Sequence, residues 1–239
     1  MEKLLSGARH LGLHLKPEQF EKFETYYHEL TDWNRRINLT SITGYDEVQV
    51  NHFLDALTVV LIWQPPAGDT RPLVIDVGTG GGIPGVPLKI TFPGIRLALL
   101  EATAKKAAFL HHLQDRLELD DTEIMVNRAE EIAHDTRYRE RFNLVLSRAV
   151  APLPTLAELT LPFCVIGGSV VVHKKGDIEE EITQASRAIG TLGGKLREVK
   201  AIELPEFPDQ RRLVVIDKVS ATPDKYPRRP GIPSKRPIT

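Results

Sequence analysis

Residues 74–88 read VIDVGTGGGIPGVPL, an apolar run that ends in an acid and passes into a cluster of glycines. Two overlapping patterns are present in it. Gly80, Gly82 and Gly85 satisfy G-x-G-x-x-G, which is typical of a dinucleotide site, whereas Gly78, Gly80 and Gly82 satisfy the G-x-G-x-G that follows an acid. Both patterns predict a tight turn between a strand and a helix, where missing side chains let a ligand approach the backbone.

Two local features favour S-adenosylmethionine over a dinucleotide. In a dinucleotide site the first glycine follows the strand at once, but here Gly78 already begins the turn and Gly80 comes two residues later. Asp76, at the tip of the strand, would repel a pyrophosphate but suits a ligand with an ammonium and a sulfonium group. We therefore predict an S-adenosylmethionine site that includes Asp76, Gly78, Gly80 and Gly82. A nicotinamide or flavin nucleotide, or a structural turn without a cofactor, are the alternatives.

The pattern around this turn predicts a doubly wound α/β fold. Short apolar runs, typical of a parallel sheet covered on both faces, alternate with helical segments. The runs cover residues 73–77, 96–100, 122–126, 143–147 and 169–173. Residues 195–204 and 211–219 leave no room for a crossover helix between them, so we expect an antiparallel hairpin at one edge of the sheet.

The carboxyl ends of these strands are where a ligand of this fold binds. Glu101 ends the second run, 23 residues beyond Gly78, and is placed to bind ribose hydroxyls. Ala129 and Glu130 follow the third run and are placed to border an adenine ring.

Residues 1–63 predict a helical cap. Apolar residues recur at helical spacing from Leu4 to Leu15 and, after Pro17, in a second helix. A further helix is expected through residues 47–63, capped by Asp46 or a neighbour. The turn-rich residues 64–72 then mark a boundary. We predict a cap in residues 1–63, a Rossmann-like domain in residues 64–219 and a tail in residues 220–239.

The composition, 41% apolar and 26% charged over 239 residues, is ordinary for a globular protein. No apolar run approaches the roughly 20 residues that span a bilayer, so we expect a cytoplasmic protein without membrane contact. The single cysteine, Cys164, excludes an intrachain disulfide. Because it lies in an apolar stretch, on the helix expected after the fourth strand, we interpret it as a small buried hydrophobe.

The tail differs in charge from the rest of the chain. Residues 220–239 carry five lysines and arginines against Asp224, a net charge of +4, whereas the whole chain has −1. A basic tail on an acidic body favours a polyanionic partner, with a merely solvated tail as the alternative. The five prolines of the tail exclude a regular helix or a central strand.

The residues at the end of the fourth strand limit which atom can accept the methyl group. Ser147, Arg148 and Ala149 stand where enzymes that methylate exocyclic amines usually carry a polar residue, two prolines and an aromatic. Methylation of cytosine C5 needs a cysteine nucleophile, which is missing there. A ring nitrogen such as guanine N7 needs only alignment, worth roughly 7 to 11 kcal/mol. No general base is assigned. Arg148 is the acceptor-side candidate, for a carboxylate, a phosphate or guanine O6.

With NRRINLT, DVGTGGGIPGVPL, NRAEE and SRAVAPL in this order, followed by HKKG and KYPRRPG, the chain resembles the ribosomal RNA small subunit methyltransferase G family, also called glucose-inhibited division protein B. The resemblance runs from about residue 20 to the end. It implies a class I S-adenosylmethionine-dependent methyltransferase fold with an N-terminal helical cap, and methylation of N7 of a guanine in 16S ribosomal RNA. The cofactor contacts it implies are Gly78, Ile83, Glu101, Ala102, Thr103, Ala129, Glu130 and Arg148. Gly81 and Glu101 depart from the proline and aspartate common in relatives.

The candidate RNA contacts are basic or polar side chains outside the strands. They are Arg35, Arg36, Asn38, Lys174, Arg228 and Arg229. His52 and Asp55 are expected to brace the cap against the sheet, and no metal site is expected at His111 and His112. We expect a monomer that acts on the small ribosomal subunit. A methyltransferase of the same fold that acts on a protein or small molecule is the alternative, and a non-catalytic RNA-binding protein is the third.

Overall fold

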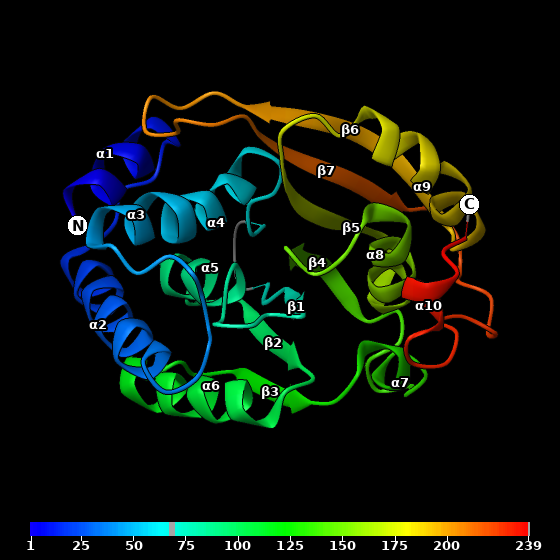
Figure 1. The fold of residues 1–239 in the computed structure, drawn as a ribbon, viewed down its shortest axis with the longest axis horizontal. Helices are drawn as coiled ribbons and strands as arrows, with labels where there is room; N and C mark the ends of the chain where they lie inside the picture. Colours follow the sequence, from blue (N-terminus) through cyan, green and yellow to red (C-terminus); the bar gives the residue numbers. More distant parts are fainter. Residues whose placement is uncertain (67–69, 239) are drawn as a thin grey trace.

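Seven strands form one mixed sheet in this computed structural model, which describes residues 1–66 and 70–238 (Figure 1). They are β1 (Leu73–Val77), β2 (Arg96–Glu101), β3 (Thr122–Val126), β4 (Phe142–Arg148), β5 (Cys164–Lys175), β6 (Gly194–Ile202) and β7 (Arg211–Lys218). Their order is β3-β2-β1-β4-β5-β7-β6. The first five are mutually parallel, and β7 runs antiparallel to both β5 and β6. The predicted parallel sheet and edge hairpin are confirmed.

Strand β5 is longer than the sequence predicted. It begins at Cys164, five residues before the expected start, and Cys164 pairs with Phe142 of β4. The expectation that Cys164 lies on a helix is wrong, because α8 (Leu153–Thr160) gives way to the 3₁₀ turn η3 (Leu161–Phe163), whose Pro162 cannot donate a helical hydrogen bond. The thiol is fully buried, as predicted, and burial raises its pKa to about 12.

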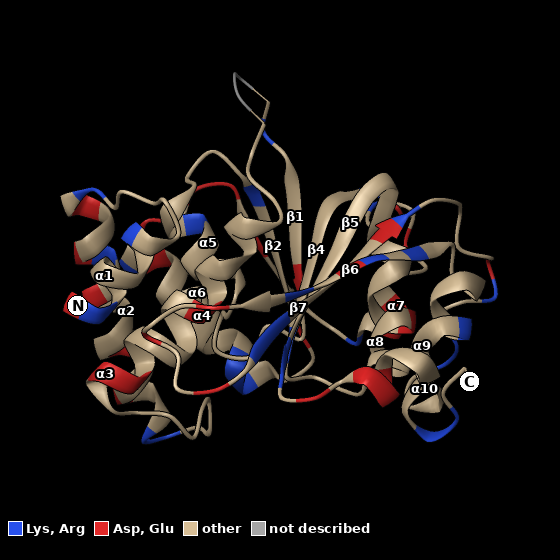
Figure 2. Ribbon diagram, turned by 90° about the horizontal axis from the view of Figure 1, so that it is seen from above, with Lys and Arg blue, Asp and Glu red and all other residues tan. Residues whose placement is uncertain are grey.

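Two helical layers cover the sheet, one on each face (Figure 2). Alternate residues of the strands point to opposite layers. Val74, Leu99 and Leu146 belong to the core shared with the cap, α5 (Gly85–Thr91) and α6 (Ala104–Leu117). Ile75 and Val145 belong to the core shared with α8 and α9 (Glu179–Thr191), and the short α7 (Ala129–Ile132) lies on the same side.

The cap consists of two helices and a longer, irregular helical run. Helix α1 (Glu2–His10) ends before Leu15, earlier than predicted, because the chain turns at Gly12 with a φ of 75°. Helix α2 (Pro17–Asn34) begins at its proline, as predicted. The third run comprises α3 (Tyr45–Val48), the π-helix η1 (Gln49–Leu54), α4 (Asp55–Leu57) and the 3₁₀ helix η2 (Thr58–Leu61).

The start and the middle of this third run differ from the prediction. Gly44 is its N-cap, so Asp46 lies inside the first turn and does not cap the helix. The middle turn is wound as a π-helix, a rare form that is frequent at functional sites. It carries Asn51 and His52 and is followed directly by Asp55.

The cap and the sheet share one apolar core. Phe23, Tyr26 and Phe53 of the cap are fully buried, with ring centroids of Phe53 5.1 Å from Phe23 and 5.0 Å from Tyr26. The same core includes Phe109 and Leu113 of α6. The proposed division into residues 1–63, 64–219 and 220–239 therefore separates parts that pack closely. Within the described residues, no helix is long and apolar enough to cross a membrane.

The tail packs on the α8 side of the sheet. Arg228 forms an ion pair with the fully buried Glu158 of α8. The Thr155 hydroxyl donates to the carbonyl of Pro233 over 3.1 Å. Residues Ile232–Lys235 form the single helical turn α10, so the expectation of no helix in the tail is wrong for these four residues. Pro233 occupies a first-turn position, where its missing N–H costs nothing.

Candidate functional site

A glycine-rich loop leaves the carboxyl end of β1 and leads into α5. Its start is fixed by the carbonyl of Leu100, which accepts hydrogen bonds from the amides of Gly78 (2.9 Å) and Thr79 (3.1 Å). Gly80 has a φ of 59°, and no protein atom lies within 4 Å of the position that a Cβ would occupy there. The backbone at Gly80 is therefore open to a ligand.

Two buried acids hold the loop from behind. One Asp76 oxygen accepts hydrogen bonds from the Thr79 hydroxyl (2.7 Å) and the Gly85 amide (2.8 Å). The Glu101 carboxylate accepts from the amides of Gly80 (3.0 Å) and Thr103 (2.8 Å). Burial raises the pKa of Asp76 to about 6. The two acids that the sequence predicts to contact the ligand thus also brace the loop.

Two cavities lie along the carboxyl edge of the sheet and share Gly78 in their linings, with the Val150 side chain packed close to it. The main cavity, about 550 Å³, is lined by the predicted residues Gly78, Gly80, Ile83, Arg148 and Lys174. The small cavity, about 180 Å³, is lined by the predicted residues Gly78, Ala102, Ala129 and Glu130, together with Val150 and Ser234. Four of the predicted cofactor contacts line neither cavity: Asp76, Gly82, Glu101 and Thr103. An elongated ligand that occupies both cavities passes over the glycine loop.

Arg148 is fixed at the wall of the main cavity by the cap. Its Nη1 donates to the carbonyl of Asn51 (2.8 Å) and to the Asp55 carboxylate (2.9 Å). Its Nη2 lies 2.9 Å from Nδ1 of His52. Arg211 of β7 forms a second ion pair with Asp55, at 2.8 Å. His52 and Asp55 thus brace the cap against the sheet, as predicted, and they also line the cavity.

Burial determines the protonation of this group. It lowers the pKa of His52 to about 4, helped by the charge of Arg148, and it lowers the pKa of His173 to about 4 as well. Burial also acts to raise the pKa of Asp55, but His173, Arg148 and Arg211 outweigh it and the pKa falls below its ordinary value. At neutral pH the wall therefore holds neutral imidazoles and an ionised carboxylate between two arginines.

Sequence reasoning missed several residues of this wall. Thr40, Asn51 and His173 line the main cavity, and Arg211 supports it from behind. His173 had a signal, because it precedes the predicted Lys174 and pairs with Arg148 in the β4–β5 register. The others come from the cap and from the distant β7, and no spacing in the sequence connects them.

The predicted RNA contacts divide into engaged and exposed side chains. Lys174 Nζ is held by Glu181 (2.6 Å) and by the carbonyl of Ala151 (3.1 Å). Arg36 is exposed and pairs with Asp32. Arg35, Asn38 and Arg229 are exposed, whereas Arg228 is the partner of Glu158.

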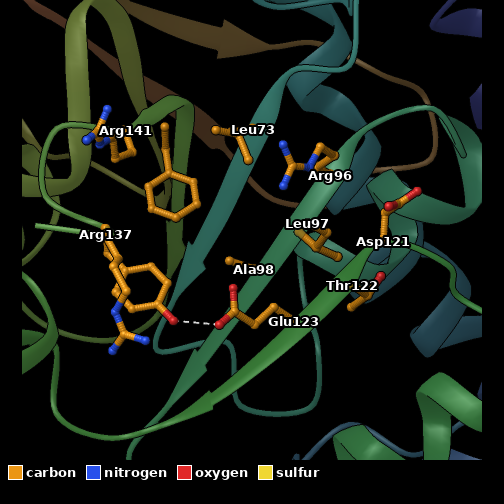
Figure 3. Close-up of a pocket in the computed structure, with 11 residues that line it drawn as sticks. Leu73, Arg96, Leu97, Ala98, Asp121, Thr122, Glu123, Arg137 and Arg141 are labelled. Carbon is orange, nitrogen blue, oxygen red and sulfur yellow. Dashed lines mark hydrogen bonds between the residues drawn. The ribbon is translucent and has the colours of Figure 1, made fainter. Parts of the chain in front are cut away.

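A third cavity lies at the opposite, amino-terminal edge of the sheet (Figure 3). It measures about 350 Å³, and its wall includes Arg96 at the start of β2 and the ring of Tyr138, whose hydroxyl donates to Glu123 over 2.5 Å. None of the predicted residues lines it. Ligands of this fold bind at the carboxyl edge, so the two cavities at Gly78 form the candidate site.

The histidine pair on α6 has a structural setting. His112 lies 2.7 Å from the Glu29 carboxylate and packs on Trp33, with ring centroids 5.1 Å apart. His111 is exposed. Among the residues that the structure describes, no group of three or more histidines, cysteines or acids is arranged to hold a metal ion.

Comparison with known proteins gives a family match over most of the chain. The family model described as "GidB: rRNA small subunit methyltransferase G" matches residues 19–214. A protein of Dehalococcoides mccartyi called ribosomal RNA small subunit methyltransferase G is 52% identical over all of both chains. A protein of Roseiflexus castenholzii with the same name is 46% identical, again over all of both chains.

Solved structures give the fold. A mutant form of the 16S rRNA (adenine(1408)-N(1))-methyltransferase from Catenulisporales acidiphilia matches with a TM-score of 0.54 at 9% identity, over 64% of this chain and 87% of that one. A precorrin-6y C5,15-methyltransferase from Geobacter metallireducens matches with a TM-score of 0.52 at 15% identity, over 69% of this chain and 88% of that one. At such low identity these matches show the class I methyltransferase fold alone, as the sequence predicted.

Proposed function

The chain belongs to the ribosomal RNA small subunit methyltransferase G family, and on that premise we propose that it transfers a methyl group from S-adenosylmethionine to N7 of one guanine in 16S ribosomal RNA. It is an S-adenosylmethionine-dependent methyltransferase, and its substrate is the RNA of the small ribosomal subunit.

The observation that carries the proposal is the pair of cavities that border on Gly78. S-adenosylmethionine is an elongated molecule, and its sulfonium makes the methyl group electrophilic. We place its adenine in the small cavity, bordered by Ala102, Ala129 and Glu130, and its methionine portion beside Gly78 and Gly80 in the main cavity. The open space above Gly80 supports this fit, because a side chain there would occupy the path of the ligand. Asp76, Gly82, Glu101 and Thr103 then support the site by shaping the loop.

The wall of the main cavity suits an acceptor that needs no general base. Among the described residues of that wall, the titratable acids and imidazoles are Asp55, His52 and His173. Asp55 is bound by two arginines, and imidazoles whose pKa is about 4 accept protons poorly at neutral pH. Guanine N7 carries no proton, so the protein has only to align it with the methyl group and exclude water.

The RNA contacts and the setting of the enzyme complete the proposal. We assign Arg35, Asn38 and Arg229 to phosphates or sugars of the RNA, because these side chains are exposed. We assign Arg36, which follows Arg35 in the sequence, to the same role. Lys174 and Arg148 contact the acceptor side of the main cavity. We propose that the enzyme acts as a monomer, since one chain supplies both cavities, and that it works in the cytoplasm, where small subunits are assembled.

The test is methylation mapped to an atom. Small subunits from cells that lack the protein are incubated with the enzyme and labelled S-adenosylmethionine, and the RNA is then treated with borohydride and aniline. We expect cleavage at a single guanine. Gly80→Ala is the inactive control, because its Cβ enters the ligand path, and Gly12→Ala is the matched variant, with a similar positive φ and equally open surroundings outside the site. Label that enters RNA without aniline cleavage would place the methyl group on another atom.

A further inference from the structure

A chain of hydrogen bonds runs from Arg148 to Thr40 and fixes the proton on His52. An arginine only donates hydrogen bonds, so at 2.9 Å His52 Nδ1 accepts from Arg148 Nη2. The carbonyl of Asn51 lies 3.1 Å from the same nitrogen and accepts a hydrogen bond from Arg148 Nη1 (2.8 Å), but the facing Nη2 of Arg148 can only donate and so requires a bare Nδ1. His52 is buried and neutral, so its single proton lies on Nε2.

The hydrogen bond between His52 and Thr40 determines which hydrogen-bonding function of the Thr40 hydroxyl remains free. His52 Nε2 lies 2.7 Å from the Thr40 hydroxyl oxygen and, because it carries the proton, it donates. The amide of Ile42 donates to the same oxygen over 3.0 Å. A hydroxyl oxygen has two lone pairs, and both are now used. Thr40 therefore has one free hydrogen-bonding function, the hydrogen of its hydroxyl.

Thr40 is held in place at the wall of the main cavity. It lies in the loop between α2 and α3 (Figure 1), and this loop is tied back by Asn34, whose side-chain oxygen accepts from the amides of Leu39 (2.8 Å) and Thr40 (2.9 Å). The residue is half-buried and lines the same cavity as Gly80 and Arg148. A fixed donor thus faces the space where the acceptor base is proposed to sit.

We propose that the Thr40 hydroxyl donates a hydrogen bond to O6 of the target guanine and thereby selects guanine over adenine, an inference that rests on the proposed function. On the edge that carries N7, guanine presents O6 as an acceptor, whereas adenine presents an amino group that donates. The Thr40 hydroxyl, with both lone pairs used and one hydrogen free, can donate to O6 of guanine but cannot accept from the amino group of adenine. Thr40 is the residue that touches the base, and His52 is a positioning residue that acts through it.

The variants Thr40→Val and Thr40→Ser separate the hydroxyl from the shape of the side chain. We expect Thr40→Val to lower kcat/KM for small subunits about tenfold, the order expected for one lost hydrogen bond between neutral groups. Thr40→Ser should retain most of the activity. Both should bind S-adenosylmethionine as the unaltered enzyme does, measured by titration calorimetry. Thr31→Val, which removes a hydroxyl bonded only to carbonyls of α2, is the matched control.

A modified substrate tests whether O6 of the guanine is the atom that the Thr40 hydroxyl contacts. Once the target guanine is mapped, small subunits are reconstituted with 16S RNA that carries diaminopurine there, so that an amino group replaces O6. The base preference is the kcat/KM on guanine divided by that on diaminopurine. We expect this preference to be at least tenfold larger for the unaltered enzyme than for Thr40→Val. Because the two enzymes are compared on the same two bases, the intrinsic reactivity of the bases cancels. An unchanged preference in Thr40→Val, or full activity of that variant, would overturn the inference. Lack of aniline cleavage with the unaltered enzyme would instead overturn the proposed function.

The same base preference shows whether His52 positions Thr40 or only supports the fold. His52→Met, which can neither accept from Arg148 nor donate to Thr40, should lose base preference in parallel with Thr40→Val. If it loses activity equally on both bases, His52 acts on the structure alone and the hydrogen-bond chain does not set specificity.

Discussion

Asp76 is an acid whose negative charge destabilises the folded chain, because the side chain is buried. Its side chain is fully buried, one carboxylate oxygen serves the loop, and the other has no hydrogen-bond partner. Because the pKa of about 6 in the fold exceeds the ordinary 3.8, the folded chain holds this proton more tightly than the unfolded chain. Stability is therefore lost as pH rises from about 3.8 to about 6.

We expect Asp76→Asn to be more stable than the unaltered chain above pH 6. The amide oxygen still accepts from Thr79 and Gly85, while the charge is removed. The gain in the free energy of unfolding should approach about 3 kcal/mol at about pH 8 and vanish near pH 4. Urea denaturation across this range measures it, with the exposed Asp224→Asn as control. A less stable variant at pH 8 would mean that the ionised carboxylate stabilises the loop.

At the scale of the element, the tail contains two adjacent arginines with different settings. Arg228 binds a Glu158 carboxylate that has no exposed surface, through contacts of 2.9 Å and 2.6 Å, whereas Arg229 is exposed. Removal of one partner of a buried ion pair leaves an uncompensated charge. We expect Arg228→Met to lower the free energy of unfolding by about 3 kcal/mol and Arg229→Met to leave it unchanged, as measured by urea denaturation.

The same two variants distinguish folding from RNA binding. A phosphate contact contributes about 0.7 to 0.9 to the slope of log K against log salt. Arg229→Met should reduce that slope by about this amount, and Arg228→Met should not, provided that the measurement is made where the variant is folded. A reduced slope in Arg228→Met and an unchanged slope in Arg229→Met would show that Arg228, not Arg229, contacts the RNA.

The helical run of residues 45–61 shows what apolar spacing cannot predict. The spacing indicated one helix, and the run is helical throughout. However, the π-helical turn of residues Gln49–Leu54 changes which side chains share a face, and so Asn51, His52 and Asp55 meet Arg148. The partners of this run, Arg148 of β4 and Arg211 of β7, lie far from it in the sequence, so local spacing gives no sign of them.

At the scale of the whole molecule, the shared core predicts a single unfolding transition. Trp33 and Trp63 pack against the core of the cap, and Cys164 lies in the core on the other face of the sheet. We expect tryptophan fluorescence and thiol reactivity to report the same urea midpoint. Phe53→Ala, which removes a ring from between Phe23 and Tyr26, should lower both midpoints together, at a cost of about 3 to 5 kcal/mol. A fluorescence change at lower urea would show that the cap unfolds independently.

Sequence reasoning predicted the fold well because local signals agree with it. The glycine turn after β1, the alternation of apolar runs and the lack of space between β6 and β7 each have one structural solution. The site was predicted only in part. Gly78, Ala102 and Glu130 follow strands directly, so the topology brings them together, whereas Thr40, His52 and Arg211 meet through the packing of the cap. Asp76 and Glu101 were recognised by position, but their hydrogen bonds hold the loop.

The last residues of the chain complete the small cavity. Ser234 forms part of its wall, and the amide of Gly231 donates to the Glu130 carboxylate over 3.0 Å. The other walls of this cavity come from residues at the ends of β1, β2 and β3 and from the loop after β4. Removal of residues 231–238 would therefore open the pocket proposed for the adenine while it leaves the seven strands in place.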